Sequence, residues 1–144
     1  MSRRDLAWTL LRLALGALFI YASAHKIVSP GAFAQEVNNY KLLPAALVNP
    51  FAMIVPWLEL ICGVAIITNR LALGASTLIA AMMVAFTVAV ASAVARHLNV
   101  SCGCFKSGGS AATWWTFARD VAMLIAAALH LCRAWTRETW NSPT

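Results

Sequence analysis

Four long apolar stretches constrain this chain more than any other feature. They cover about residues 6–24, 50–67, 71–95 and 114–135, close to the roughly 20 residues that cross a ~30 Å hydrocarbon core. With 61% hydrophobic and 11% charged residues, the chain has too little polar surface for a soluble globule. Lipid offers no partner to backbone amides, so each span should be a helix. The sequence predicts an all-α fold, a four-helix transmembrane bundle formed by one integral membrane domain, residues 1–144.

The connection between the first two spans, residues 27–49, does not read as a plain loop. Phe33, Val37 and Tyr40 recur at helical spacing between Pro30 and Pro44, with polar residues interleaved. This pattern predicts a short amphipathic helix. We expect it to lie along the outer membrane interface, close to the loop that follows the third span.

The basic residues indicate the topology. With the amino terminus in the cytoplasm, five arginines fall inside and four cations outside: Arg3, Arg4, Arg70, Arg133 and Arg137, against Lys26, Lys41, Arg96 and Lys106. Both termini are therefore expected to be cytoplasmic. The first stretch is interrupted by Arg12, so we interpret it as a span and not as a cleaved signal peptide. The net charge of +6 is read as a topology signal and does not indicate nucleic-acid binding.

Two cysteines one residue apart are the strongest chemical signal. Cys102 and Cys104 flank Gly103 in a polar, glycine-rich loop that would face an oxidising compartment. A disulfide across such short spacing would be strained, and strain makes a disulfide labile and suited to exchange. Two alternatives stay open: the thiols are inert or pair elsewhere, or they bind Cu(I) with His25 or His97 as further ligands.

The other two cysteines carry a weaker signal. Cys62 and Cys132 fall towards the cytoplasmic ends of their spans, where buried free cysteine usually behaves as a small apolar residue. We therefore expect both to pack in the core. A second redox pair feeding the loop is the alternative, although its depth argues against direct exchange.

Charged residues inside the spans are candidates for function. Glu59 lies about 13 Å beyond Pro50 at 1.5 Å per residue, near the bilayer centre, where a carboxylate is costly. Arg119 and Asp120 occupy a compatible depth in the fourth span. We expect Arg119 to pair with Glu59 if these helices are neighbours. The pair would serve either to fix helix register or to handle protons.

Several residues are expected around the cysteine loop. Lys26 and His25 should emerge at the outer surface, where the cation would raise the reactive thiolate fraction. His25 and His97 are candidates for proton transfer, or they are ordinary interface residues. Trp114 and Trp115 suit an aromatic belt, with the border of a quinone pocket as the alternative.

Five segments together resemble one family. They are residues 19–33 (FIYASAHKIVSPGAF), 40–44 (YKLLP), 55–63 (VPWLELICG), 102–105 (CGCF) and the Arg-Asp pair at 119–120. The chain resembles the MauE branch of the DoxX-like membrane proteins. That resemblance implies a four-helix protein of the bacterial inner membrane, associated with redox maturation of exported, disulfide-rich proteins. Relatives in the wider group look linked to quinones.

The sequence therefore predicts an inner-membrane thiol-disulfide redox protein that supports maturation of exported proteins. Cys102 and Cys104 would exchange with a periplasmic thioredoxin-like or disulfide-containing partner, and a membrane quinone is the candidate cofactor. No resident metal is predicted, and enzymatic activity is left open. The alternatives are a copper- or small-solute-handling bundle and a non-catalytic assembly subunit. The order of attack, the partner's identity and the oligomeric state do not follow from the sequence.

Overall fold

Five helices make up the described part of the chain. A computed structural model describes residues 3–98 and 114–141. The helices are α1 (Arg3–Val28), α2 (Pro30–Asn39), α3 (Ala45–Thr68), α4 (Ala72–Ala95) and α5 (Trp114–Asn141). No strand occurs in these residues, so the described fold is all-α.

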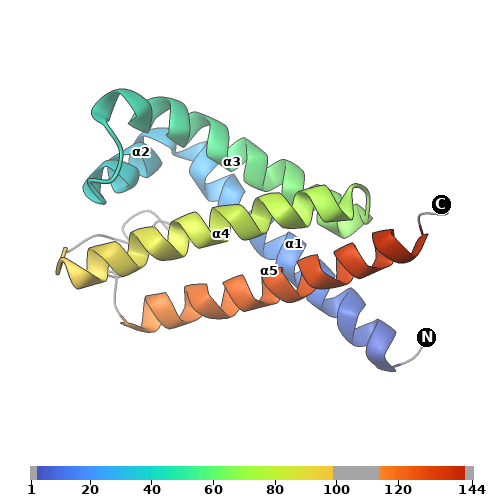
Figure 1. Cartoon of the computed structure of the whole chain (residues 1–144). Helices are drawn as coiled ribbons and strands as arrows, with labels where there is room; N and C mark the ends of the chain where they lie inside the picture. Colours follow the sequence, from blue (N-terminus) through green and yellow to red (C-terminus); the bar gives the residue numbers. More distant parts are fainter. Residues whose placement is uncertain (1–2, 99–113, 142–144) are drawn as a thin grey trace.

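The long helices form two antiparallel pairs. Helix α1 packs along α3, and α4 packs along α5, while α3 joins the second pair through its contacts with α4 (Figure 1). A cluster of buried apolar side chains fills the space between the pairs: Leu15, Phe19, Cys62, Ile66, Ala75, Ile79, Met83 and Ala127. Both termini lie at the end of the molecule that holds the α3–α4 turn (Figure 1). Helix α2 lies at the opposite end.

Helix boundaries follow local chemistry. Pro30 occupies the first turn of α2, where its missing N–H costs nothing. Pro44 precedes α3, and Asn69 ends that helix in the left-handed conformation that asparagine tolerates. Pro50 and Pro56 lie within α3, as prolines in membrane helices commonly do.

Three helices are long and apolar enough to cross a membrane within the described residues: Asp5–Val28, Ala45–Thr68 and Ala72–Ala95. They correspond to the first three predicted spans: the first two extend beyond the predicted bounds at both ends, and the third begins one residue later than predicted and ends where predicted. Helix α5 has 28 residues and runs beside α4, but it is not among the three. A fourth span therefore stays a prediction.

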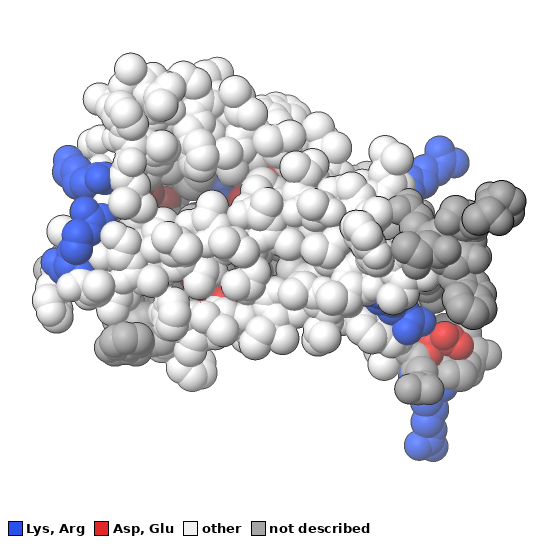
Figure 2. All heavy atoms as spheres, in the orientation of Figure 1, with Lys and Arg blue, Asp and Glu red and all other residues white. Residues whose placement is uncertain are grey.

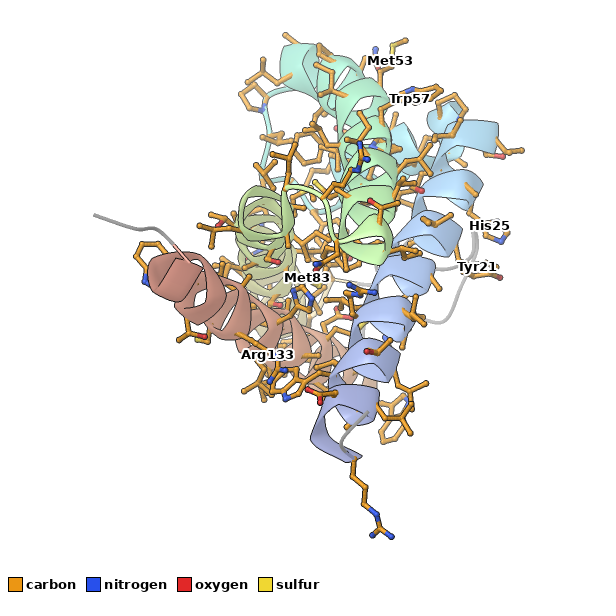
Figure 3. The ribbon with its side chains drawn as sticks, turned by 90° about the vertical axis from the view of Figure 1, so that its right-hand side faces the viewer. Tyr21, His25, Met53, Trp57, Met83 and Arg133 are labelled. Carbon is orange, nitrogen blue, oxygen red and sulfur yellow. The ribbon has the colours of Figure 1, made fainter. Side chains whose placement is uncertain are left out.

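The outer surface agrees with a lipid environment. Figure 2 shows exposed basic residues gathered at the two ends of the molecule, with a broad surface between them on which few charged atoms are visible. Large apolar side chains are exposed on this surface, including Leu10, Met53, Ile54, Trp57 and Val88. Met53 and Trp57 point away from the bundle in Figure 3. Such a surface is too apolar for water and suits acyl chains.

The predicted helix between Pro30 and Pro44 is present as α2, and its environment is more buried than expected. The helix packs against α3 and the end of α1. Phe33 and Glu36 are both buried. Residues three and four apart share one helix face, so the spacing that buries Phe33 also buries Glu36, despite its charge. A purely interfacial position for this helix is not confirmed.

Close approach of α1 and α3 depends on two glycines. A Cβ atom added at Gly16 would lie 2.5 Å from Ile67 Cγ1 and 2.9 Å from the Gly63 carbonyl oxygen. A Cβ atom added at Gly63 would lie 3.0 Å from the Gly16 carbonyl oxygen. Small residues at a helix crossing let membrane helices pack backbone to backbone.

We expect Gly63→Ala to destabilise the protein by about 1–3 kcal/mol, because the added methyl forces α1 and α3 apart. Gly74→Ala in α4 is the matched control, since nothing lies within 4 Å of its added Cβ atom. That control should be neutral or slightly stabilising, because alanine is the better helix former. Unfolding in mixed detergent micelles measures both. Equal stability of the two variants would contradict the close-packed crossing.

Candidate functional site

A buried ion pair lies where α1 and α3 meet near the α2 end of the molecule. The Lys26 ammonium Nζ is 2.7 Å from Glu59 Oε1 and 2.8 Å from Oε2, so it donates to both carboxylate oxygens. The two side chains are only 5% and 8% exposed. Charges this far from water persist only when they are paired and hydrogen-bonded. The geometry therefore identifies one tightly bound unit shared by two membrane helices.

Aromatic rings from two further helices flank the lysine. Nζ lies 4.9 Å from the centroid of the Phe33 ring on α2 and 5.9 Å from that of Phe86 on α4. A cation is attracted to the negative face of an aromatic ring at these distances. Lysine also carries three N–H donors, of which Glu59 accepts two. The ammonium group is thus held by four helices and keeps a donor for a further acceptor.

A cavity of about 440 Å³ adjoins this ion pair. Its remaining lining is mostly apolar and comes from α2, the segment before α3, α3 and α4: Val37, Leu42, Phe51, Val55, Met82 and Phe86. Figure 2 shows acidic and basic atoms in a hollow between the lobe of α2 and α3 and the neighbouring α4. An apolar pocket of this size with few polar groups is typical of small-molecule sites.

One hydrogen bond secures the end of the molecule near this cavity. A guanidinium nitrogen of Arg96, at the end of α4, donates to the backbone carbonyl of Tyr40 beyond α2. Tyr40 itself is buried against Val90 and Ala93 of α4. This contact ties the α2–α3 connection to α4, so the cavity has support on both sides.

The structure corrects two sequence-based predictions at this site. Lys26 was expected at the outer surface, but it is buried against Glu59. Glu59 was correctly predicted to be a buried charge, but its partner is Lys26 and not Arg119. In the described part of the chain, α5 packs on α4 and α1 and makes no contact with α3. Two side chains at the same depth in the bilayer cannot pair when their helices are not neighbours.

Arg119 and Asp120 form their own pair on α5. The Arg119 guanidinium is 3.2 Å from Asp120 Oδ1. The aspartate side chain is 2% exposed, whereas the arginine side chain is 38% exposed. Asp120 is therefore a further buried carboxylate, on the opposite helix pair from Glu59.

The remaining predicted residues do not converge on the ion pair. Cys102 and Cys104 lie outside the described residues, so their predicted role is not tested. His25 is exposed, stacks edge-on against Tyr21 with ring centroids 4.9 Å apart, and points away from the bundle (Figure 3). His97 is exposed just beyond α4.

Trp115, one of the two predicted tryptophans, is not in the described lining of the cavity beside Lys26. Trp115 is 82% exposed near the start of α5. The side chain of Trp114 lies outside the described part of the structure. The border of a quinone pocket therefore stays a prediction for this pair.

The two cysteines inside the helices differ in their surroundings. Cys62 is buried in the core cluster, as predicted. Cys132 is exposed on α5, so the prediction that it packs in the core is wrong. Both are free thiols. The outward face of α5 at this point has no neighbouring helix in the described chain, which explains the exposure.

Sequence reasoning missed a buried polar contact and a buried acid. Ser76 Oγ on α4 is 2.8 Å from His130 Nδ1 on α5, and both residues are buried. A histidine within an apolar stretch was the available signal. Glu36, in the lining of the cavity, could have been found from its three-residue spacing to Phe33.

The fold and this site define a class: an α-helical integral membrane protein with a buried ion pair beside an apolar cavity. The family described as Methylamine utilisation protein MauE matches residues 4–133. The chain therefore belongs to the MauE family, as its sequence motifs predicted.

Curated relatives agree with this assignment. A "Methylamine utilization protein MauE" of Methylophilus methylotrophus is 41% identical over 92 residues, or 62% of this chain and 48% of the relative. Proteins of the same name from Methylorubrum extorquens and Paracoccus denitrificans are 34% and 30% identical. Each of these two alignments covers 83% of this chain, and 65% and 64% of the respective relative. The chain thus spans about half to two thirds of the length of these relatives. No solved structure matches it.

Proposed function

We propose that this chain is an accessory membrane protein of methylamine utilisation that supports disulfide formation in an exported protein. Cys102 and Cys104 would carry the exchange. The observation behind this proposal is that the family match covers the Cys-Gly-Cys segment, which follows an apolar membrane helix. The assignment to methylamine utilisation comes from the names of the relatives.

The first half of the exchange, oxidation of the partner protein, needs no reactant besides the partner and the Cys102–Cys104 disulfide. A thiolate of the partner protein attacks the Cys102–Cys104 disulfide and forms a mixed disulfide. A second thiolate of the partner then attacks this bond, so the partner leaves oxidised and both Cys102 and Cys104 become thiols. Two electrons and two protons have passed to the membrane protein, which must lose them again.

The cavity beside Lys26 fits a quinone ring as the final acceptor. Its apolar walls and the Phe33 and Phe86 rings suit a flat hydrophobic group, and the remaining N–H donor of Lys26 suits a carbonyl oxygen. When bound, a quinone supplies the capacity to take up two electrons and two protons. Glu59 and Glu36 line the same cavity and provide carboxylates for holding those protons.

The arrangement of the helices supports an inner-membrane topology for this proposal. Both termini lie at one end of the bundle, and α4 ends and α5 begins at the other (Figure 1). With the termini in the cytoplasm, the Cys-Gly-Cys segment would face the periplasm. A thioredoxin-like or disulfide-containing periplasmic protein is then the partner.

Trapping of the mixed disulfide tests the exchange directly. In a Cys104→Ser variant, the Cys102 thiolate can attack the disulfide of the oxidised partner, in the reverse direction of this exchange, and no Cys104 thiol is present to displace the partner from the mixed disulfide; Cys102→Ser tests the other cysteine. We expect one of these variants to accumulate a reductant-sensitive adduct that contains a periplasmic protein. The Cys102→Ser/Cys104→Ser double variant is the control and should form none. Absence of an adduct in both single variants would contradict the exchange.

A second candidate function is handling of a small solute by the membrane bundle. The cavity of about 440 Å³ with its buried ion pair favours this alternative, because such a pocket can bind a solute without thiol chemistry. The two candidates differ in their dependence on cysteine. Solute handling should survive loss of both loop thiols but not loss of Lys26.

A further inference from the structure

A second cavity of about 440 Å³ lies at the end of the molecule that holds the termini. It is bounded by α1, the start of α4 and α5, so it is separate from the cavity beside Lys26. Its polar lining consists of Asp5, Thr9, Arg12, Asn69, His130 and Arg133. Figure 3 shows Arg133 on α5 near the point where this helix passes α1. The proposed redox function makes no use of these residues.

The charges of this cavity do not balance. The only carboxylate among its described lining residues, Asp5, is 3.7 Å from Arg133, which also lies over the Trp8 ring at 4.6 Å. Arg12 forms no ion pair with a described residue, and its buried Nε has no hydrogen-bond partner among the described residues. A buried charged donor left unsatisfied is costly. The surplus of positive charge therefore calls for an anionic acceptor.

The remaining groups favour an oxyanion with several acceptor atoms. Guanidinium groups donate in a planar fork that matches phosphate oxygens. Ala72 and Leu73 bring the first turn of α4 to the cavity wall, and that turn has no side-chain cap. Its N–H groups and the helix dipole also favour negative charge. The hydrogen bond between Ser76 and His130 Nδ1 fixes the imidazole ring beside the same space.

We infer that this cavity binds a phosphate group, presented by an anionic phospholipid. Exposed apolar side chains of α1, namely Leu6, Leu10 and Leu13, lie along the helix that lines it and provide a surface for acyl chains. Leu71 at the start of α4 is also exposed. Basic pockets between membrane helices bind anionic headgroups in this way. A free phosphate ion shares the same chemistry and is the other source that the test must separate.

Lipid titration of the purified full chain tests this site. Native mass spectrometry in detergent would compare binding of phosphatidylglycerol and phosphatidylcholine. We expect preferential retention of phosphatidylglycerol, and binding about tenfold weaker in Arg12→Gln, because a hydrogen bond to a charged group is lost. Arg12→Lys keeps the positive charge but lacks the planar N–H donors of the guanidinium group, so this variant should bind phosphatidylglycerol at intermediate strength. Arg70→Gln is the matched control, since Arg70 is exposed at the same end and does not line the cavity.

Competition separates the two sources of phosphate. If millimolar inorganic phosphate leaves bound phosphatidylglycerol in place, the lipid is the ligand, whereas displacement would overturn the lipid assignment. Arg133→Gln is a second variant of a residue that lines the cavity. Tryptophan fluorescence and gel filtration establish that each variant is folded. Equal phosphatidylglycerol binding by the wild type and by folded Arg12→Gln and Arg133→Gln would show that the cavity is not the site.

Discussion

Replacing Lys26 with alanine should lower the free energy of unfolding by about 3–5 kcal/mol, the largest stability effect expected in this protein. The substitution leaves the Glu59 carboxylate buried without its two hydrogen bonds from Nζ. Glu59→Gln should cost a comparable amount, because the ammonium then loses its counter-charge. Unfolding titrations in mixed micelles, followed by tryptophan fluorescence, measure these differences.

The double variant Lys26→Met/Glu59→Leu distinguishes a paired charge from two independent ones. It should be less destabilised than either single variant, since no buried charge remains. Lys41→Met is the matched control for loss of a lysine at the same end of the molecule, because Lys41 is exposed. Its effect should lie within about 0.5 kcal/mol. Additive losses in the double-mutant cycle would mean that the two side chains do not interact.

The second large effect concerns activity. Cys102→Ser or Cys104→Ser should abolish disulfide maturation of the partner protein, because exchange needs one attacking and one resolving thiol. The amount of folded protein in the membrane should stay unchanged. Complementation of a deletion strain, with the partner's redox state followed by alkylation of its thiols, measures this loss.

Cys132→Ser is the control that separates a general thiol effect from the proposed exchange. Cys132 is a free, exposed cysteine on α5, so the substitution should leave both maturation and stability unchanged. Full maturation by the Cys102→Ser/Cys104→Ser variant would refute the thiol-exchange function. The non-catalytic assembly role predicted as an alternative would then become the better explanation.

Hydrophobic pattern alone was enough to find most of the elements. The helices over Asp5–Val28, Ala45–Thr68 and Ala72–Ala95 follow from apolar length, because lipid permits few backbone structures other than a helix. The helical spacing of Phe33, Val37 and Tyr40 predicted α2. Glu59 was predicted to be a buried charge from its position along the second apolar stretch, which places it near the bilayer centre. These features depend on local sequence, so they could be read without the fold.

The partner of Glu59 could not be predicted in the same way. The depths of Lys26 and Arg119 along their helices do not reveal which helix lies beside α3. That choice depends on the crossing of α1 and α3 at Gly16 and Gly63, which only the three-dimensional packing shows. The same packing buries Lys26, although its position at the end of a predicted span suggested an exposed cation.

The sequence by itself determined the class of protein, its family and the chemical signal of Cys102 and Cys104. Tertiary structure alone decided that Glu59 pairs with Lys26 and that two cavities of similar volume form at opposite ends of the bundle. The physical reason is one of distance. Helix formation and membrane partitioning depend on residues within a few turns of one another, whereas the pair of Lys26 and Glu59 joins residues 33 positions apart and each cavity is lined by several helices.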